Sequence, residues 1–233
     1  MIHSNETHNH SHEHDHNHSC ISLVPIFNHL EQEEMDEINA STHTVSYKRG
    51  EIIYHAGEQS DALYIVHEGK IKIYNLSESG KQQLLRILKP GDFTGELSLF
   101  SESTHESYSE AMENTSICIF KRSDLQKLLL KYPTISLKLL NEFSKILKDS
   151  HKQTTRFATE RVETRIALYL AECAEENHSN TFELPMTKVN LASYLGTTPE
   201  TISRKLTDLE DEGLIKKNGK KIKILDLDGL MLI

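Results

Sequence analysis

The segment TKVNLASYLGTTPETISRKLTDL, residues 187–209, constrains the fold more than any other part of this 233-residue chain. Thr187 is a suitable N-cap for a first short helix, and Gly196 suits the turn that would end it. Thr198 is a suitable N-cap for a second helix, where Pro199 takes the first position and its missing N–H has no cost. Two short helices joined by a tight turn that contains glycine predict a helix-turn-helix.

The second helix carries two chemically different faces. At about 100° per residue, one face collects the apolar side chains Ile202, Leu206 and Leu209. Another face, near the amino end, carries Glu200, Ser203, Arg204 and Thr207. Arginine can bind guanine bidentately, glutamate can accept from the cytosine amino group, and hydroxyl groups can contact several bases. This face is therefore predicted to enter the major groove of DNA; an ordinary solvated helix face is the alternative.

A lysine-rich hairpin is predicted after this helix. In LIKKNGKKIKIL, two β-type runs flank Asn218-Gly219, a pair typical of a type I′ turn. From Arg161 onward the chain has 10 Lys and Arg against 12 Asp and Glu, yet its lysines gather around this turn. Clustered cations can hold DNA phosphates even though the whole chain has a net charge of −9. The segment thus predicts a winged helix that binds duplex DNA through Thr198, Glu200, Ser203, Arg204, Thr207, Lys217 and Lys220.

Glycines divide an earlier part of the chain, residues 45–120, into short β-type runs. They recur at intervals of 7 to 12 residues, at positions 50, 57, 69, 80 and 91. Such spacing is typical of a small antiparallel sandwich or roll. The sequence SESG between two of these runs indicates a hairpin loop.

A long helix is predicted to follow the β-rich part. A short helix capped by Ser123 should end near Pro133, and nothing breaks helical periodicity over residues 134–158. One apolar stripe has the heptad spacing of a dimer seam and includes Leu140, Phe143, Leu147 and Phe157. A second stripe can pack on the roll and contains Ile135, Leu139 and Ile146. A core helix within a single subunit is the alternative.

These elements predict an α+β fold in four parts. Residues 1–19 form a histidine-rich tail expected to be disordered, 20–130 an antiparallel β-roll, 131–159 a dimerisation helix and 160–233 the winged helix-turn-helix. No apolar run approaches the ~18 residues of a membrane span and no secretory signal is present, so we expect a cytoplasmic protein without a membrane partner. No nucleophile elbow, P-loop or dinucleotide fingerprint occurs, which argues against an enzyme.

This order of parts resembles the Crp/Fnr superfamily of bacterial transcription regulators. The resemblance covers about residues 20–230 and rests on GEQSDALYIVHEGKIKIY, LKPGDFTGELSLF, ERVETRIALYLAECA and MTKVNLASYLGTTPETISRKLTDLEDEGLI. It implies a roll like that of cyclic-nucleotide-binding domains and a homodimer joined through the long helices. It also implies a palindromic operator in double-stranded DNA and RNA polymerase as a further partner.

The recognition helix is similar to that of the Fnr branch, whose half-site is TTGAT. The similarity lies in the pattern Glu200-x-x-Ser203-Arg204. The cyclic-AMP branch instead has arginine before the glutamate and glycine before the second arginine, where this chain has Pro199 and Ser203. The resemblance implies that Arg204 reads the guanine, Ser203 a thymine and Glu200 the neighbouring base pairs.

The same resemblance argues against cyclic AMP as the effector. GELSLF, which begins with Gly95 and Glu96, resembles the start of the family's phosphate-binding cassette, in which an arginine and a serine or threonine follow. Here Glu106 takes the place of that arginine, and Ser107 follows it. A carboxylate repels a phosphate, and the surrounding stretch has no Lys or Arg to offset it. These four residues are therefore expected to form a vestigial effector pocket.

The three cysteines argue against a four-cysteine Fe–S cluster but allow a redox response. A cluster of the Fnr kind needs four thiolates, whereas the chain has only Cys20, Cys118 and Cys173, so a cluster would have to use histidines. Cys20 and Cys118 can form a redox-responsive disulfide if the fold brings their Cα atoms within about 7 Å. The alternative for Cys118 is a small buried apolar side chain.

The amino-terminal segment HNHSHEHDHNHSC offers candidate metal ligands. Neutral imidazoles suit Zn, Ni, Cu or Co and a thiolate favours Zn or Cu(I); the candidates are His8, His10, His12, His14, His16, His18 and Cys20. Alternating histidines define many overlapping sites, which suit capture of divalent metal better than discrimination. A metal-responsive switch, a metal store, a solvated tail and a tag remnant all stay open. The alternative to a regulator is accordingly a metal-buffering protein with residual DNA binding.

Overall fold

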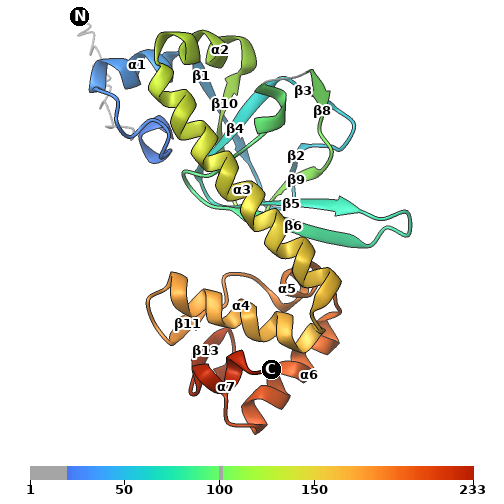
Figure 1. The fold of residues 1–233 in the computed structure, drawn as a ribbon. Coiled ribbons are helices and arrows are strands. Elements are labelled where there is room, and N and C mark those ends of the chain that lie inside the picture. The colour runs from blue at the N-terminus through green and yellow to red at the C-terminus, as the bar shows by residue number, and fades with distance from the viewer. Residues whose placement is uncertain (1–19, 100–101) are drawn as a thin grey trace, which may run out of the picture.

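The computed structural model describes the backbone of residues 20–99 and 102–233, and the side chains of 21–97 and 102–233. A β-roll and a carboxyl-terminal unit are joined by α3 (Pro133–Thr159), which runs along one side of the roll and continues to the second unit (Figure 1). The expected architecture is confirmed: a β-rich first domain, a long helix and a carboxyl-terminal helix-turn-helix.

The roll is built from antiparallel strands. One sheet has the order β1-β10-β4-β7, another β2-β9-β5-β6, and β3 pairs with β8. The strands are β1 (Thr42–Tyr47), β2 (Ile52–Tyr54), β3 (Gln59–Ser60), β4 (Ala62–Glu68), β5 (Ile71–Leu76), β6 (Gln82–Leu88), β7 (Phe93–Thr94), β8 (Ser103–Thr104), β9 (Tyr108–Ala111) and β10 (Thr115–Lys121). Gly69 shows why the turns need glycine: its φ is +80°, and a Cβ there would lie 2.5 Å from the Asn114 carbonyl oxygen.

Short helices close one end of the roll. They are η1 (Cys20–Leu23), α1 (Gln32–Ala40), η2 (Glu96–Leu99) and α2 (Arg122–Lys131). Ile21 is fully buried in the same apolar cluster as Phe120 of β10 and Ile135 of α3. The predicted cap at Ser123 is wrong, because β10 runs directly into α2 and leaves Lys121 at the N-cap position.

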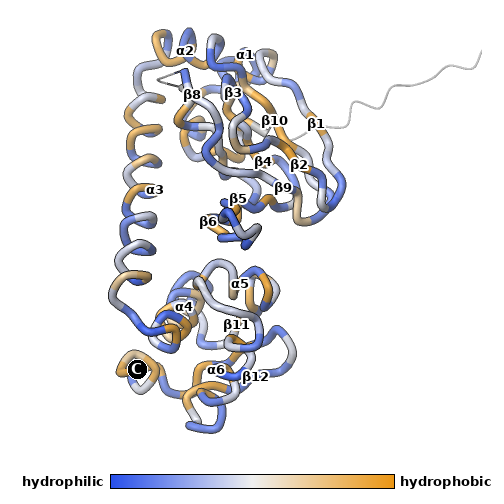
Figure 2. Tube along the Cα trace, turned by 90° about the vertical axis from the view of Figure 1, so that its right-hand side faces the viewer, coloured by the Kyte–Doolittle hydropathy of each residue, from blue (hydrophilic) through white to orange (hydrophobic). Residues whose placement is uncertain are grey.

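One face of α3 packs on the roll and another is exposed. Ile135 and Leu139 are 0% and 1% exposed and belong to the core of the roll. Leu140 and Leu147 are both 56% exposed. Figure 2 shows apolar and polar positions alternating along this helix. Although α3 has 27 residues, neither it nor any other helix in the described part of the chain is apolar enough over a sufficient length to cross a membrane.

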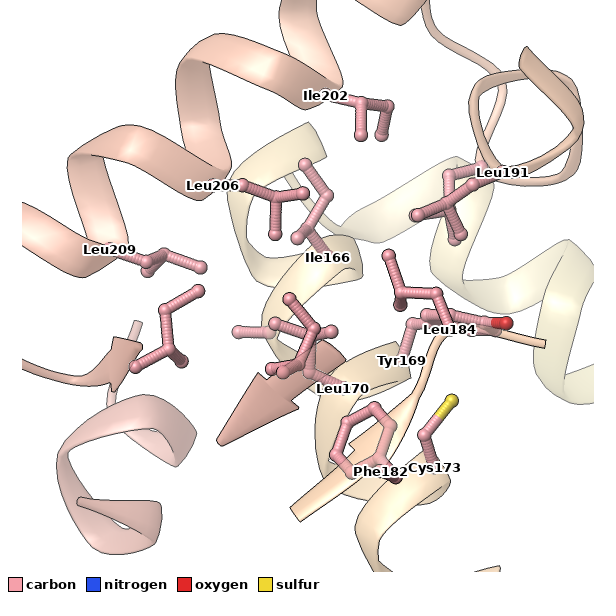
Figure 3. Close-up of a cluster of buried hydrophobic side chains, with 14 of the residues drawn as sticks. Ile166, Tyr169, Leu170, Cys173, Phe182, Leu184, Leu191, Ile202, Leu206 and Leu209 are labelled. Atoms are coloured by element: carbon pink, nitrogen blue, oxygen red, sulfur yellow. The ribbon is translucent and has the colours of Figure 1, made fainter. Parts of the chain in front are cut away.

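The carboxyl-terminal unit is a helix-turn-helix followed by a wing. Its elements are α4 (Val162–Glu176), β11 (Thr181–Glu183), α5 (Lys188–Tyr194), α6 (Pro199–Asp211), β12 (Ile215–Asn218), β13 (Lys221–Ile224) and α7 (Leu227–Met231). The three small strands pair in the order β11-β13-β12. Figure 3 shows α4, α5 and α6 contributing side chains to one core, among them Ile166, Leu170, Leu191, Ile202, Leu206 and Leu209. Periodicity therefore predicted the buried face of α6 correctly.

The turn of the wing differs from the expected one. Asn218 is the last residue of β12 and pairs with Lys221, so the two loop residues are Gly219 and Lys220. Gly219 has a φ of +61°, and His178 is the one residue other than glycine with positive φ in the described chain. Positive φ at the first loop residue alone is the pattern of a type II′ turn, so the predicted type I′ turn over Asn218-Gly219 is wrong.

Candidate nucleic-acid interface and sensor site

The first turn of α6 is fixed by its cap. Thr198 Oγ1 accepts a hydrogen bond from the Thr201 N–H at 3.2 Å, and Pro199 occupies the first helical position. Ile202 and Leu206 are 0% and 1% exposed, which anchors one side of the helix in the core. The rotation of α6 about its own axis is therefore set by burial, and its amino-terminal outer face is presented to solvent.

Arg204 and Glu200 are both exposed on this outer face. Arg204 is exposed and makes no hydrogen bond or ion pair with any residue the structure describes. Glu200 is also exposed, and its own backbone N–H and the neighbouring Thr198 hydroxyl lower the pKa of its carboxyl group. Glu200 is consequently ionised at neutral pH and acts as a hydrogen-bond acceptor only.

Ser203 has a neighbour that the sequence analysis missed. Lys188 Nζ donates to Ser203 Oγ at 3.3 Å. An ammonium group is only a donor, so the hydroxyl hydrogen of Ser203 stays available for an acceptor outside the protein. Lys188 is the first residue of α5 and is exposed. Its cationic side chain was visible in the sequence, but its contact with α6 depends on the angle between the two helices.

Thr207 and Lys217, both predicted DNA contacts, bind each other. Lys217 Nζ donates to Thr207 Oγ1 at 2.6 Å and lies 3.2 Å from Glu210 Oε2. The Thr207 hydroxyl in turn donates to the Ser203 carbonyl oxygen at 3.0 Å. These contacts connect the base of the wing to α6 and occupy the Thr207 hydroxyl hydrogen. Lys220, at the tip of the wing, is exposed.

The predicted effector residues line one pocket, which α3 and the carboxyl-terminal unit also line. Some of its polar groups are paired, whereas His105 Nε2 and Ser103 Oγ are buried without a hydrogen-bond partner among the described residues. Glu96 Oε1 lies 3.2 Å from Arg86 Nη2, and the Tyr54 hydroxyl lies 2.8 Å from Thr94 Oγ1. Gly95 and Ser107 line the same pocket. Glu106 also belongs to the lining and is exposed. Within the described residues, the pocket therefore presents the exposed side chain of Glu106, which the sequence predicts to stand in place of a phosphate-binding arginine.

A buried histidine in this pocket was not found from the sequence. His105 is 7% exposed and stacks on Tyr54, with ring centroids 3.7 Å apart and planes inclined by 7°. Burial lowers the pKa of His105, so the ring is neutral in the folded protein near pH 7. No sequence signal could have identified it, because its partner lies 51 positions earlier in the chain (Tyr54 against His105).

The cysteines differ in state. Cys118 is 1% exposed and disulfide-bonded, and the Thr44 hydroxyl lies 3.6 Å from its sulfur. Cys173 is a free thiol, and burial raises its pKa to about 11. The side chain of Cys20 lies outside the described residues. A raised pKa suppresses the thiolate form, so Cys173 is a poor nucleophile and a poor metal ligand.

The candidate metal ligands cannot be placed. His8, His10, His12, His14, His16 and His18 and the side chain of Cys20 lie outside the described residues. Within residues 21–97 and 102–233, no three or more His, Cys, Asp or Glu side chains gather as a metal site would require. Metal binding by the tail, and the metal-buffering alternative, stay predictions.

The predicted seam residues of α3 have different surroundings. Leu140 and Leu147 are exposed, whereas Phe143 packs against the core of the roll. The Phe157 ring lies 5.2 Å from the guanidinium carbon of Arg165. The apolar surface that α3 leaves exposed therefore differs from the predicted seam: it includes Leu140 and Leu147, lacks Phe143 and adds Leu137, which is 69% exposed.

Comparison with known proteins agrees with this architecture. The family described as "Cyclic nucleotide-binding domain" matches residues 44–132, and "Crp-like helix-turn-helix domain" matches residues 164–233. The chain is 36% identical over 212 residues to "Probable transcriptional regulator flp" of Lacticaseibacillus casei, covering 91% of this chain and 96% of that protein. It is 29% identical over 209 residues to "Transcriptional activator protein Anr" of Pseudomonas protegens, covering 87% and 84% respectively. The solved structure of FixK2 from Bradyrhizobium japonicum superposes with a TM-score of 0.71 at 28% identity, over 81% of this chain and 95% of that one.

Proposed function

Because the chain belongs to the Crp/Fnr superfamily of bacterial transcription regulators, we propose that it regulates transcription as a homodimer bound to a palindrome of TTGAT-like half-sites. The observation that carries this proposal is the outer face of α6, where Arg204 is exposed and free of partners within the described chain. Contact with RNA polymerase is part of the proposal by analogy with the family. The named relatives are transcription regulators, not enzymes.

The half-site is carried over from the Fnr branch of the family, and the chemistry of three side chains supports it. Arg204 can donate two hydrogen bonds to guanine O6 and N7. Ser203 receives a hydrogen bond from Lys188 and keeps its own hydroxyl hydrogen, which suits the O4 acceptor of thymine. Glu200, held ionised, suits an amino group on a neighbouring base pair. In this proposal the contact between Thr207 and Lys217 holds the wing against α6, and neither side chain reads a base.

The exposed stripe of α3 is the proposed dimer contact. Leu137, Leu140 and Leu147 are 69%, 56% and 56% exposed, at spacings of three and seven residues. A row of exposed leucines with heptad spacing is what a parallel helix pair buries. Two copies of α6 can then contact two half-sites related by the same two-fold axis.

A thiol–disulfide response is the proposed signal. Cys118 is disulfide-bonded and Cys173 is free, so elimination among three cysteines leaves Cys20 as the proposed partner. Ile21 supports this, since it lies in the same buried cluster as Cys118. With a small disulfide as oxidant, two protein thiols become one disulfide while the oxidant becomes two thiols. In this proposal the mixed disulfide forms first on Cys20, because Cys118 is buried.

The test is a titration of a labelled TTGAT-N4-ATCAA duplex against a scrambled duplex at one stated salt concentration. Reduced and oxidised protein are compared, both in chelator. We expect specific binding whose affinity differs at least about tenfold between the two states, and loss of that difference in Cys118→Ala but not in Cys173→Ala. Equal affinities would reject the thiol response, and equal binding to both duplexes would reject the half-site. Adding Zn²⁺ to the reduced protein tests the metal response predicted from the tail.

A further inference from the structure

The roll and the helix-turn-helix are joined by a second contact besides the chain itself. Ser193 Oγ, on α5, accepts from the Leu84 N–H and donates to the Gln82 carbonyl oxygen, each at 2.8 Å. Gln83 Nε2 donates to the Ser193 carbonyl oxygen, also at 2.8 Å. Figures 1 and 2 both place β6 on the side of the roll that faces α5. One serine hydroxyl thus binds two backbone groups of a strand in the other domain.

A bulge in β6 directs apolar side chains into the same contact. Leu84 pairs with Tyr74 and Arg86 with Ile73, so Leu85 is the extra residue between them. An extra residue changes the alternation of faces, and it places Leu84 and Ile87 on the outer face of the sheet. Leu84 is 1% exposed there because the core of the carboxyl-terminal unit covers it, and Ile87 packs against that core.

Side chains brace the connection between α3 and the carboxyl-terminal unit: Arg156 Nη1 and Nη2 donate to Glu172 Oε2 and Oε1, each at 2.8 Å, and Gln153 Nε2 donates to the Tyr194 carbonyl oxygen at 3.4 Å. Glu160 and Arg161 link α3 to α4, and both have extended backbone conformations (φ −102°, ψ 144° and φ −68°, ψ 157°). Two extended residues between helices can serve as a hinge. In both Figure 1 and Figure 2, α6 lies beyond α5 on the side away from the roll. The contact between β6 and α5 therefore acts together with the Arg156–Glu172 pair in holding α6 on that side.

We propose that Ser193 and Leu84 form a latch between sensor and DNA-binding domain, and that Ser193 is a positioning residue for DNA binding. The latch selects the orientation in which the outer face of α6 is available to the major groove. Unlatched protein is not competent to bind the operator, so the apparent affinity falls in proportion to the fraction of protein that stays latched. This inference rests on the proposed function, because it presumes that α6 reads DNA.

The test uses the full-length protein with Ser193→Ala. The change removes one hydroxyl and leaves the Leu84 N–H and the Gln82 carbonyl oxygen without their partner. We expect operator binding to weaken roughly 5- to 30-fold, as for a loss of one or two hydrogen bonds, and amide exchange in residues 82–88 to accelerate. Ser193→Thr, which keeps the hydroxyl group, should restore both values. Leu84→Ser, which changes the apolar side chain on the outer face of the sheet, should also weaken operator binding.

Ser179→Ala is the matched control. The Ser179 hydroxyl also accepts from one backbone N–H and donates to one carbonyl, both of Thr181 at 3.1 Å, but entirely within the carboxyl-terminal unit. It should leave affinity and exchange in β6 unchanged. Unchanged or tighter binding by Ser193→Ala would overturn the latch. If the wild type does not prefer the operator, the half-site is wrong, and the latch is judged on exchange in β6 and binding to the scrambled duplex.

Discussion

Arg204→Met is expected to weaken operator binding without destabilising the protein. The guanidinium group is exposed and unpaired among the described residues, so its loss leaves no buried group without a partner. The free energy of unfolding should change by less than about 0.5 kcal/mol. A bidentate contact to guanine contributes about 1–3 kcal/mol of discrimination. When the guanine contact is lost in one half-site of the duplex, a free energy of this size raises Kd about 5- to 150-fold.

The assay compares two chemical changes in the DNA with one change in the protein. Replacing the guanine of one TTGAT half-site by 7-deazaguanine removes the N7 acceptor, whereas inosine keeps O6 and N7 and serves as the control base. Wild-type protein should lose affinity with 7-deazaguanine and keep it with inosine. Arg204→Met should bind all three duplexes equally, because the contact that distinguishes them is gone. Arg49→Met, which removes an exposed arginine from the roll, should behave as wild type.

Additive effects of the protein change and the DNA change on affinity would refute the assignment of Arg204 to the guanine. If Arg204→Met still loses as much affinity with 7-deazaguanine as the wild type does, another side chain reads the guanine. A variant that weakens all duplexes alike, and that flattens the dependence of binding on salt, would make Arg204 a phosphate contact instead.

Three further predictions follow from burial and exposure. If the proposed dimer forms through α3, Leu147→Glu should sediment as a monomer, whereas Leu130→Glu on α2, a position 85% exposed and away from the stripe, should sediment as a dimer; dimers of both variants would reject α3 as the dimer contact. Cys173, with a pKa raised to about 11, should react with a thiol reagent at pH 7.5 only as fast as the protein unfolds, and rapid native labelling would contradict its burial. His105 has a lowered pKa in the fold, so the unfolded chain binds its proton more readily. The free energy of unfolding should therefore fall as the pH drops below ~6.5 towards the folded-state pKa, with a shallower slope in His105→Gln; equal slopes would show that the ring is not held neutral.

Local periodicity was sufficient to predict the recognition helix. The caps at Thr187 and Thr198 and the spacing of Ile202, Leu206 and Leu209 depend on residues close together in the chain. The turn of the wing was harder. Both possible registers place Ile215 and Ile222 on the same face, so burial alone could not choose between a loop at Asn218-Gly219 and one at Gly219-Lys220.

The contact between the domains could not be predicted from the sequence. In an alternating strand, Leu84 and Ile87 would point to opposite faces, and only the bulge at Leu85 brings them to one side. No sequence signal marks that bulge. The stacking of His105 on Tyr54 is equally invisible, because it depends on which strands of the roll become neighbours.

The free and the engaged side chains of the interface have different consequences when they are replaced. The Arg204 side chain has no partner in the described chain, so its replacement is expected to act on the complex with DNA and not on the folded protein. Thr207 and Lys217 already bind each other, so their replacement acts on the folded protein as well as on the complex. The sequence pattern predicts the same role for all three residues, because each is expected near the DNA-facing side of α6 or its wing. Sensitivity to base identity should therefore concentrate in Arg204, Ser203 and Glu200, while Thr207 and Lys217 should affect every duplex alike.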